Sequence, residues 1–319
     1  MDALNLMAKL KMDSSEYDEG LEKARNSASK LGSGLSKVAS VGAKAMGTLV
    51  KVSTAAIGAA TAGIGAMVKQ SVDAYGEYEQ MVGGVKKLYG NMGMSLEEYA
   101  KSVGQTVDEV SDKYQQLEDA QNLVLKNAEN AFKTSGMSMN QYMDTATTFS
   151  ASLIKSLDGD TLKAAEQTEV AMKAISDNFN TFGGDIGMIR GAFQGFAKQN
   201  YTMLDNLKLG YGGTKTEMEK LIADANEYAA SIGKASNMSI ESFSDIVTAI
   251  DLIQQKQQIA GTTAREATTT IQGSLGMLKA AWENLLTGMG DKNADLSKKM
   301  KDLVEALVGG TKEIGRAHV

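Results

Sequence analysis

A repeated helix start, first met as MSLEEY at residues 94–99, indicates the fold of this chain. A serine N-cap accepts a hydrogen bond from the backbone N–H three residues on, where a glutamate or glutamine can return the bond. A methionine before the cap and an aromatic residue four after it can pack together as a hydrophobic staple. Three such sets occur, at Met94, Ser95 and Tyr99, at Met137, Ser138 and Tyr142, and at Met238, Ser239 and Phe243. We therefore predict helices that begin near residues 95, 138 and 239.

Other capping residues and the absence of proline extend this prediction to the whole chain. Further helix starts are predicted at Thr106, Asp160, Thr216 and Thr263. Average usage would give about 16 prolines in a chain of this length, whereas the 319 residues contain none. Proline breaks helices, so its absence favours long, uninterrupted ones. We predict an all-α protein in which small side chains pack together, because there are 33 glycines and only 6% aromatic residues.

Composition also excludes several kinds of chemistry. Without cysteine there can be no disulfide, thiolate nucleophile or cysteine-bound zinc, and a single histidine leaves little room for histidine catalysis. The net charge of −6 argues against general nucleic-acid binding. We predict no enzymatic activity, no metal, no cofactor and no sequence-specific nucleic-acid partner.

Residues 1–12 alternate between apolar and polar side chains, with Leu4, Leu6 and Leu10 on one face. Alternation of this kind is typical of a half-buried strand. No partner strand follows, so we expect these leucines to face another subunit or protein. The alternative is an extension of the first helix or a frayed tail.

Residues 13–72 are expected to form a long, basic helical rod rich in glycine and alanine. From Lys23 to Val72 there are seven basic residues and no acidic one. Lysines recur at steps of seven, at Lys23, Lys30, Lys37, Lys44 and Lys51. This heptad spacing places the lysines in one stripe beside a narrow apolar seam, as in a helix that packs along a partner. The alternative is an ordinary solvated helix face.

Within this rod, residues 52–68 form an uncharged segment of 17 residues. Its length lies at the lower limit for a membrane span, and its small side chains make it only modestly apolar. Three interpretations stay open at this point: a bilayer-inserting helix, a buried or self-associating helix, and a helix that inserts only after release.

Two glycine-containing stretches resemble ligand loops only superficially. Residues 210–216 lack the glycine that precedes the lysine of a phosphate loop, so we interpret them as a turn between helices. Residues 158–160 place two aspartates around a glycine but lack the later ligands of a calcium loop. We interpret this second stretch as a turn followed by a helix cap.

One block of sequence resembles a known family. Residues 193–214, FQGFAKQNYTMLDNLKLGYGGT, are similar to the N-terminal part of tail tape measure proteins of long-tailed phages and prophages, especially those of Gram-positive hosts. Further segments resemble the same family in the same order: 78–85, 131–138, 149–153, 261–267, 271–274 and 279–286. The resemblance covers most of residues 1–290.

This resemblance implies a structural protein that lies in the lumen of the tail tube, sets tail length and leaves ahead of the DNA during ejection. It implies partners of four kinds: other copies of the chain, the tube protein, tail assembly chaperones and distal tail proteins. Contact with the host membrane during ejection is a further expectation, and assembly would take place in the host cytoplasm. Residues 73–290 would form the N-terminal helical domain, and 291–312 the start of a downstream helical region.

The final residues, 313–319, read as the translation of a sequencing adapter, so we interpret them as an artefact that contains the only histidine.

Two other functions are alternatives to that of a tail tape measure protein. A peptidoglycan hydrolase associated with the tail is the first, but no lytic-transglycosylase signature is present. A membrane-active helical protein is the second, and it would share the segment 52–68 without accounting for the block at 193–214.

Overall fold

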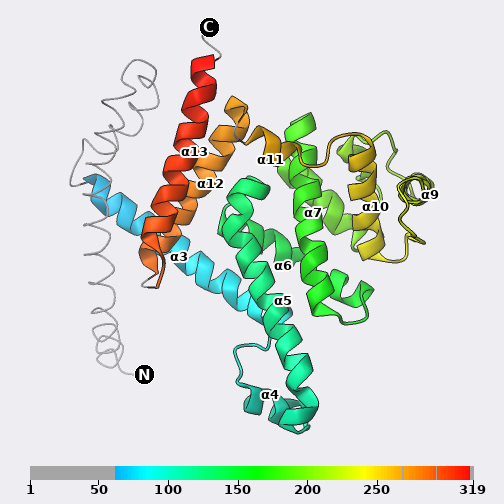
Figure 1. Cartoon of the computed structure of the whole chain (residues 1–319), viewed down its shortest axis with the longest axis horizontal. Helices are drawn as coiled ribbons and strands as arrows, with labels where there is room; N and C mark the ends of the chain where they lie inside the picture. The colour runs from blue at the N-terminus through cyan, green and yellow to red at the C-terminus, as the bar shows by residue number, and fades with distance from the viewer. Residues whose placement is uncertain (1–61, 268, 292, 317–319) are drawn as a thin grey trace. The chain divides into compact units, whose positions relative to one another are not determined.

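In the computed structural model, residues 62–267, 269–291 and 293–316 are described, and all their regular structure is helical (Figure 1). The prediction of an all-α protein is confirmed for these residues. The predicted strand at 1–12 and the rod up to residue 61 lie outside them. Helix α3, Ala62–Leu88, continues through residues 72 and 73, where the sequence analysis placed a domain boundary.

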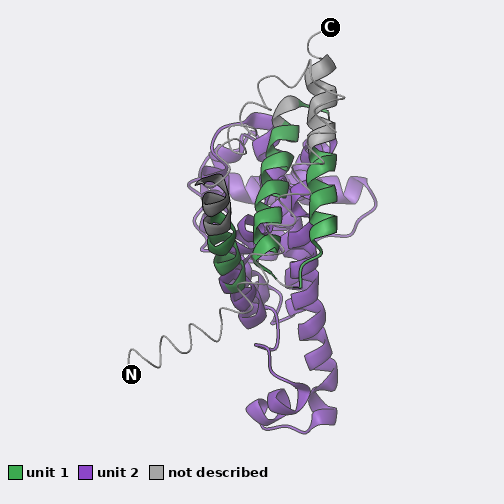
Figure 2. Ribbon diagram, turned by 90° about the vertical axis from the view of Figure 1, so that its left-hand side faces the viewer, with its two compact units in different colours: residues 1–79, 268–319 green, residues 80–267 purple. Residues whose placement is uncertain are grey.

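The chain divides into two compact units, coloured separately in Figure 2. Unit 1 comprises residues 1–79 and 268–319, and unit 2 comprises residues 80–267. Unit 2 is therefore an insertion in the chain of unit 1. Helix α3 contributes its first part to unit 1 and its last turns to unit 2.

Unit 1 is built on helices α12, Ile271–Gly290, and α13, Leu296–Arg316, which pack along each other. The buried residues of α12 recur at helical spacing, among them Met277, Ala281 and Leu285. The first part of α3 joins them, because the Ser71 hydroxyl donates a hydrogen bond of 2.8 Å to the carbonyl oxygen of Leu286.

Helix α7 lies at the centre of the packing in unit 2. α7 packs against α5, α6, α8, α10 and α11. Small residues such as Ala120 and Ala131 on α5 and Ala164 and Ala171 on α7 are fully buried, which allows these two long helices to approach closely. The helices of the unit are α4, Leu96–Val103; α5, Val107–Thr134; α6, Met139–Ser156; α7, Thr161–Phe182; α8, Ile186–Phe196; η1, Leu204–Leu207; α9, Lys215–Ser231; α10, Phe243–Lys256; and α11, Thr262–Glu266.

The first two helix starts have the predicted capping boxes. At α4 the Glu98 backbone N–H donates to the Ser95 hydroxyl at 3.2 Å, and the Ser95 N–H donates to the Glu98 carboxylate at 2.8 Å. Ser138 and Gln141 exchange the equivalent bonds at α6. Thr106 and Asp160 cap α5 and α7, also as predicted.

The third predicted start, at Met238 and Ser239, is wrong. Helix α10 begins at Phe243, and its N-cap is Ser242, whose hydroxyl accepts a hydrogen bond of 3.2 Å from the Asp245 N–H. Asp245 also accepts a hydrogen bond of 3.0 Å from the Ser239 N–H, so the segment before the helix folds back on its first turn. Asp245 occupies the third helical position after Ser242, whereas a helix capped by Ser239 would have Ser242 there, which cannot complete a capping box.

Two further helices begin earlier in the sequence than predicted, also for local reasons. Helix α9 begins at Lys215, because the hydroxyl of Thr214 rather than that of Thr216 accepts the capping bond. Helix α11 begins at Thr262 after Gly261, which has a positive φ of 78° and no side chain to act as a cap.

Candidate functional site

The block at 193–214 forms a continuous folded element and is the first part of the candidate site. Phe193 and Phe196 lie on α8, and Tyr201 follows the turn after that helix. Ring centroids are 5.9 Å apart between Phe193 and Phe196, and 6.4 Å apart between Phe196 and Tyr201. Leu204 and Leu207 on η1 are fully buried. The apolar residues of the block therefore belong to the core of unit 2.

Two glycines of the block permit close approach of backbone to backbone. A Cβ at Gly195 would lie 2.9 Å from the Asn200 carbonyl oxygen, and one at Gly213 would collide with the Thr202 carbonyl oxygen. Neither separation is compatible with a side chain unless the backbone shifts. The Asn200 N–H also donates to the Gly195 carbonyl oxygen at 2.9 Å, which closes the turn after α8. Backbone approach therefore accounts for glycine at both positions.

Side chains of two other helices hold the second half of the block. The Asn178 amide on α7 is 1% exposed and donates a hydrogen bond of 2.7 Å to the Leu207 carbonyl oxygen. The Gln257 amide, directly after α10, donates to the Leu209 carbonyl oxygen at 2.9 Å. Buried carbonyl groups of an irregular segment need such partners. Side chains of α7 and of the residue after α10 therefore hold the second half of the block in place.

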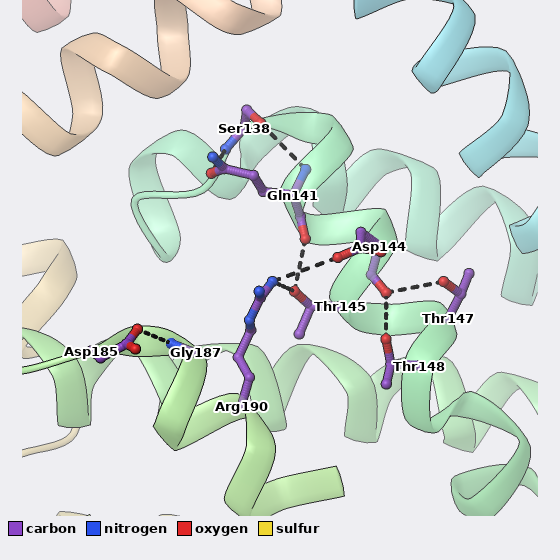
Figure 3. Close-up of polar contacts among 9 residues, drawn as sticks. All are labelled: Ser138, Gln141, Asp144, Thr145, Thr147, Thr148, Asp185, Gly187 and Arg190. Carbon is purple, nitrogen blue, oxygen red and sulfur yellow. Dashed lines mark hydrogen bonds and ion pairs between the residues drawn. The ribbon is translucent and has the colours of Figure 1, made fainter.

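A polar contact joins helix α8, just before the block, to the capped start of α6 (Figure 3). The Arg190 guanidinium on α8 donates to the Thr145 hydroxyl at 3.0 Å and lies 3.6 Å from the Asp144 carboxylate. The Thr145 hydroxyl in turn donates to the carbonyl oxygen of Gln141, a member of the capping box, at 2.8 Å. This contact therefore ties α8, which leads into the block, to the first turns of α6. Asp185 caps the first turn of α8 beside them.

Asp177 on α7 supplies the cap that α11 lacks locally. Its carboxylate is 4% exposed and accepts hydrogen bonds from the backbone N–H groups of Gly261, at 2.6 Å, and Thr263, at 2.8 Å. Negative charge at a helix N-terminus is favourable, and hydrogen bonds to ionised groups are strong. This contact fixes the segment 261–267, another part of the resemblance, to the centre of the unit.

Two buried tyrosines anchor the first half of α7. The Tyr142 hydroxyl donates to the Glu169 carboxylate at 2.7 Å, and Glu169 also forms an ion pair of 3.2 Å with Lys173. Burial, followed by the adjacent Glu169 charge, raises the pKa of Tyr142 well above its usual value. Tyr89 lies 2.6 Å from the Thr168 hydroxyl, and burial raises its pKa to about 12. Both phenols remain protonated at neutral pH, so they act as structural ties.

The two glycine-containing stretches are turns, as predicted. Residues 210–214 connect η1 to α9, and Asp158 and Gly159 both have positive φ in the turn before the Asp160 cap. Within the described ranges, no group of three or more acidic or histidine side chains could hold a metal ion. Among the same residues, no helix is both long and apolar enough to cross a membrane.

The partner-facing residues predicted from the sequence lie outside the described part of the chain. They are Leu4, Leu6, Leu10, Lys23, Lys30, Lys37, Lys44 and Lys51. Sequence reasoning missed the anchoring side chains of Asp177, Asn178 and Arg190, whose only signal is their position among apolar residues on helices. No family model, curated protein or solved structure matches the chain.

Proposed function

We propose that this chain is the N-terminal part of a phage or prophage tail tape measure protein with a structural, non-enzymatic role. In this proposal the chain lies in the lumen of the tail tube, acts as a length template during tube assembly and takes part in genome ejection. Its partners are other copies of itself, the tube protein, assembly chaperones and distal tail proteins.

The observation that carries the proposal is the ordered set of segments that resemble this family, above all residues 193–214. The packing of these segments supports it. Phe193, Phe196, Leu204 and Leu207 are all at most 1% exposed, so the similarity follows positions that the fold of unit 2 depends on. A resemblance that fell only on exposed loops would be weaker support.

Helix geometry also suits a length template. An α-helix rises 1.5 Å per residue, so the 28 residues of α5 extend over about 42 Å. A chain without proline can continue such helices over long distances. Unit 2 itself is a folded helical domain, so the extended template in this proposal is the chain beyond it.

The test is made in the phage or prophage that encodes the chain. Insertion of 70 helix-forming residues after residue 312 is expected to lengthen the tail by about 105 Å, measured by electron microscopy of negatively stained virions. A matched insertion of 70 glycine- and serine-rich residues controls for added mass without added helix. Normal tails after deletion of the gene, or the absence of the chain from purified tails in mass spectra, would refute the proposal.

A further inference from the structure

The end of unit 2 formed by α4 and the first half of α5 has a largely exposed surface. Figures 1 and 2 show these helices extending beyond the other helices of the unit. We call residues 91–119 the acidic arm. Its net charge is −5, from seven carboxylates and two lysines.

Three exposed polar positions on α5 form a regular stripe along the arm. Asp108, Asp112 and Asp119 are all exposed, and their spacing of four and seven residues places them on one face of the helix. The interval from Asp112 to Asp119 corresponds to about 10 Å along the helix axis. Gln115, between them on the same face, donates a hydrogen bond of 2.9 Å to Asp119.

The arm also exposes apolar side chains and is held in a defined conformation. Met92, Val103 and Val107 are 59%, 45% and 38% exposed, and the two valines flank the turn between α4 and α5. The hydroxyl of Tyr114 on α5 donates to the Met94 carbonyl oxygen at 2.9 Å, which fixes the loop before α4. A preformed surface that combines exposed apolar groups with an excess of negative charge is typical of a docking site.

The basic segment of the same sequence has the complementary pattern. Residues 23–72 carry seven positive charges and no negative one, and the lysines from Lys23 to Lys51 recur every seven residues. Seven residues of helix span about 10 Å, the same distance that separates Asp112 from Asp119. Two successive lysines of a helix can therefore lie opposite these two carboxylates, with the apolar seam of that helix beside the exposed valines.

Chain geometry favours binding between copies rather than within one. The arm follows the C-terminal end of α3, whereas the lysines precede its N-terminal end at Ala62. Helix α3 therefore separates the arm from the residues that lead to the lysines by about 39 Å along its axis. We propose that the acidic arm of one copy binds residues 23–51 of a second copy. This inference deepens the self-association that the proposed function includes, while the insertion after residue 312 tests the length-template role separately.

Charge reversal in the full chain tests this inference. One variant carries D108K, D112K and D119K, and a second carries K30E, K37E and K44E. Each is expected to weaken self-association by roughly tenfold or more in sedimentation velocity, and both sets in one chain are expected to restore it. Added salt should weaken the wild-type association. A neutral variant with D108N, D112N and D119N is expected to self-associate with intermediate affinity. It tests the same three positions if the lysine variant fails to fold, and circular dichroism checks the fold of every variant.

A matched control changes three exposed carboxylates of unit 2 outside the arm, E166K, E219K and E227K. It alters the net charge equally and is expected to leave association unchanged. Because the chain has no cysteine, S36C in one copy and S111C in another should form a mixed disulfide under mild oxidation. A monomeric wild type, an equal effect of the control variant, failure of the combined variant to restore association, or a disulfide only within the doubly substituted chain would overturn the proposal.

Discussion

Removal of the Asp177 carboxylate tests whether helix α11 depends on a cap from another helix. Asp177→Ala deletes the acceptor of two short hydrogen bonds, at 2.6 and 2.8 Å, and leaves the N–H groups of Gly261 and Thr263 without this partner. Hydrogen bonds to an ionised group contribute about 1.5–3 kcal/mol each, so a loss of about 4 kcal/mol is expected. The total stability of a domain is only about 5–15 kcal/mol.

The assay is urea denaturation of the full chain, followed by circular dichroism. With a denaturant dependence of about 2.5 kcal/mol per molar urea, the midpoint should fall by about 1.5 M. The control is Asp185→Ala, which removes an exposed cap of α8 and should cost only about 1 kcal/mol. Amide hydrogen exchange at Gly261 and Thr263 should accelerate in the Asp177 variant alone. Equal midpoints for the two variants, or unchanged exchange at these amides, would refute the reasoning.

Three further substitutions follow from the packing and electrostatics of unit 2. Gly213→Ala should lower the thermal midpoint, because the new methyl group meets a backbone carbonyl, while Gly212→Ala meets only ordinary contact and should change it little. Tyr142→Phe should cost about 1–2 kcal/mol by removing the hydrogen bond to Glu169, and spectrophotometric titration should show one high-pKa tyrosine fewer. Burial raises the pKa of Asp251 and is only partly offset by the hydrogen bond from Gln255, so ionisation of its carboxylate opposes folding and wild-type stability falls as pH rises through that pKa. Asp251→Asn should therefore be more stable at pH 7, and this advantage should disappear as pH falls below the ordinary aspartate range. A constant difference at all pH values would contradict it.

The helices of unit 2 were predictable where their signals are local. Ser95, Thr106 and Ser138 each meet a glutamate or glutamine three residues later, and each caps a helix. At residues 238–243 two serines compete for the cap, and Ser242 takes it by accepting a hydrogen bond from the N–H of Asp245, which lies outside the Met–Ser–aromatic set.

The anchors of the candidate site could not be predicted in the same way, because their partners are distant in sequence. Asp177 binds backbone groups 84 and 86 residues later, and Asn178 binds one 29 residues later. Nothing in a helix of mixed composition identifies which polar residue has such a partner. The turn at 210–214 was predictable from its glycines and from Thr214, whose hydroxyl caps α9 three residues later, whereas the contact of Gly213 with Thr202 was not.

The insertion of unit 2 within unit 1 determines how the chain would respond to mechanical tension. A force applied through residues 62 and 316 enters α3 and α13, both of which contribute to unit 1. The bond from Ser71 to Leu286 and the packing of α12 along α13 carry this load directly, while residues 80–267 lie off the path of force. Unit 1 must open before unit 2 is stretched, so extension would proceed in two steps, with the larger length released second.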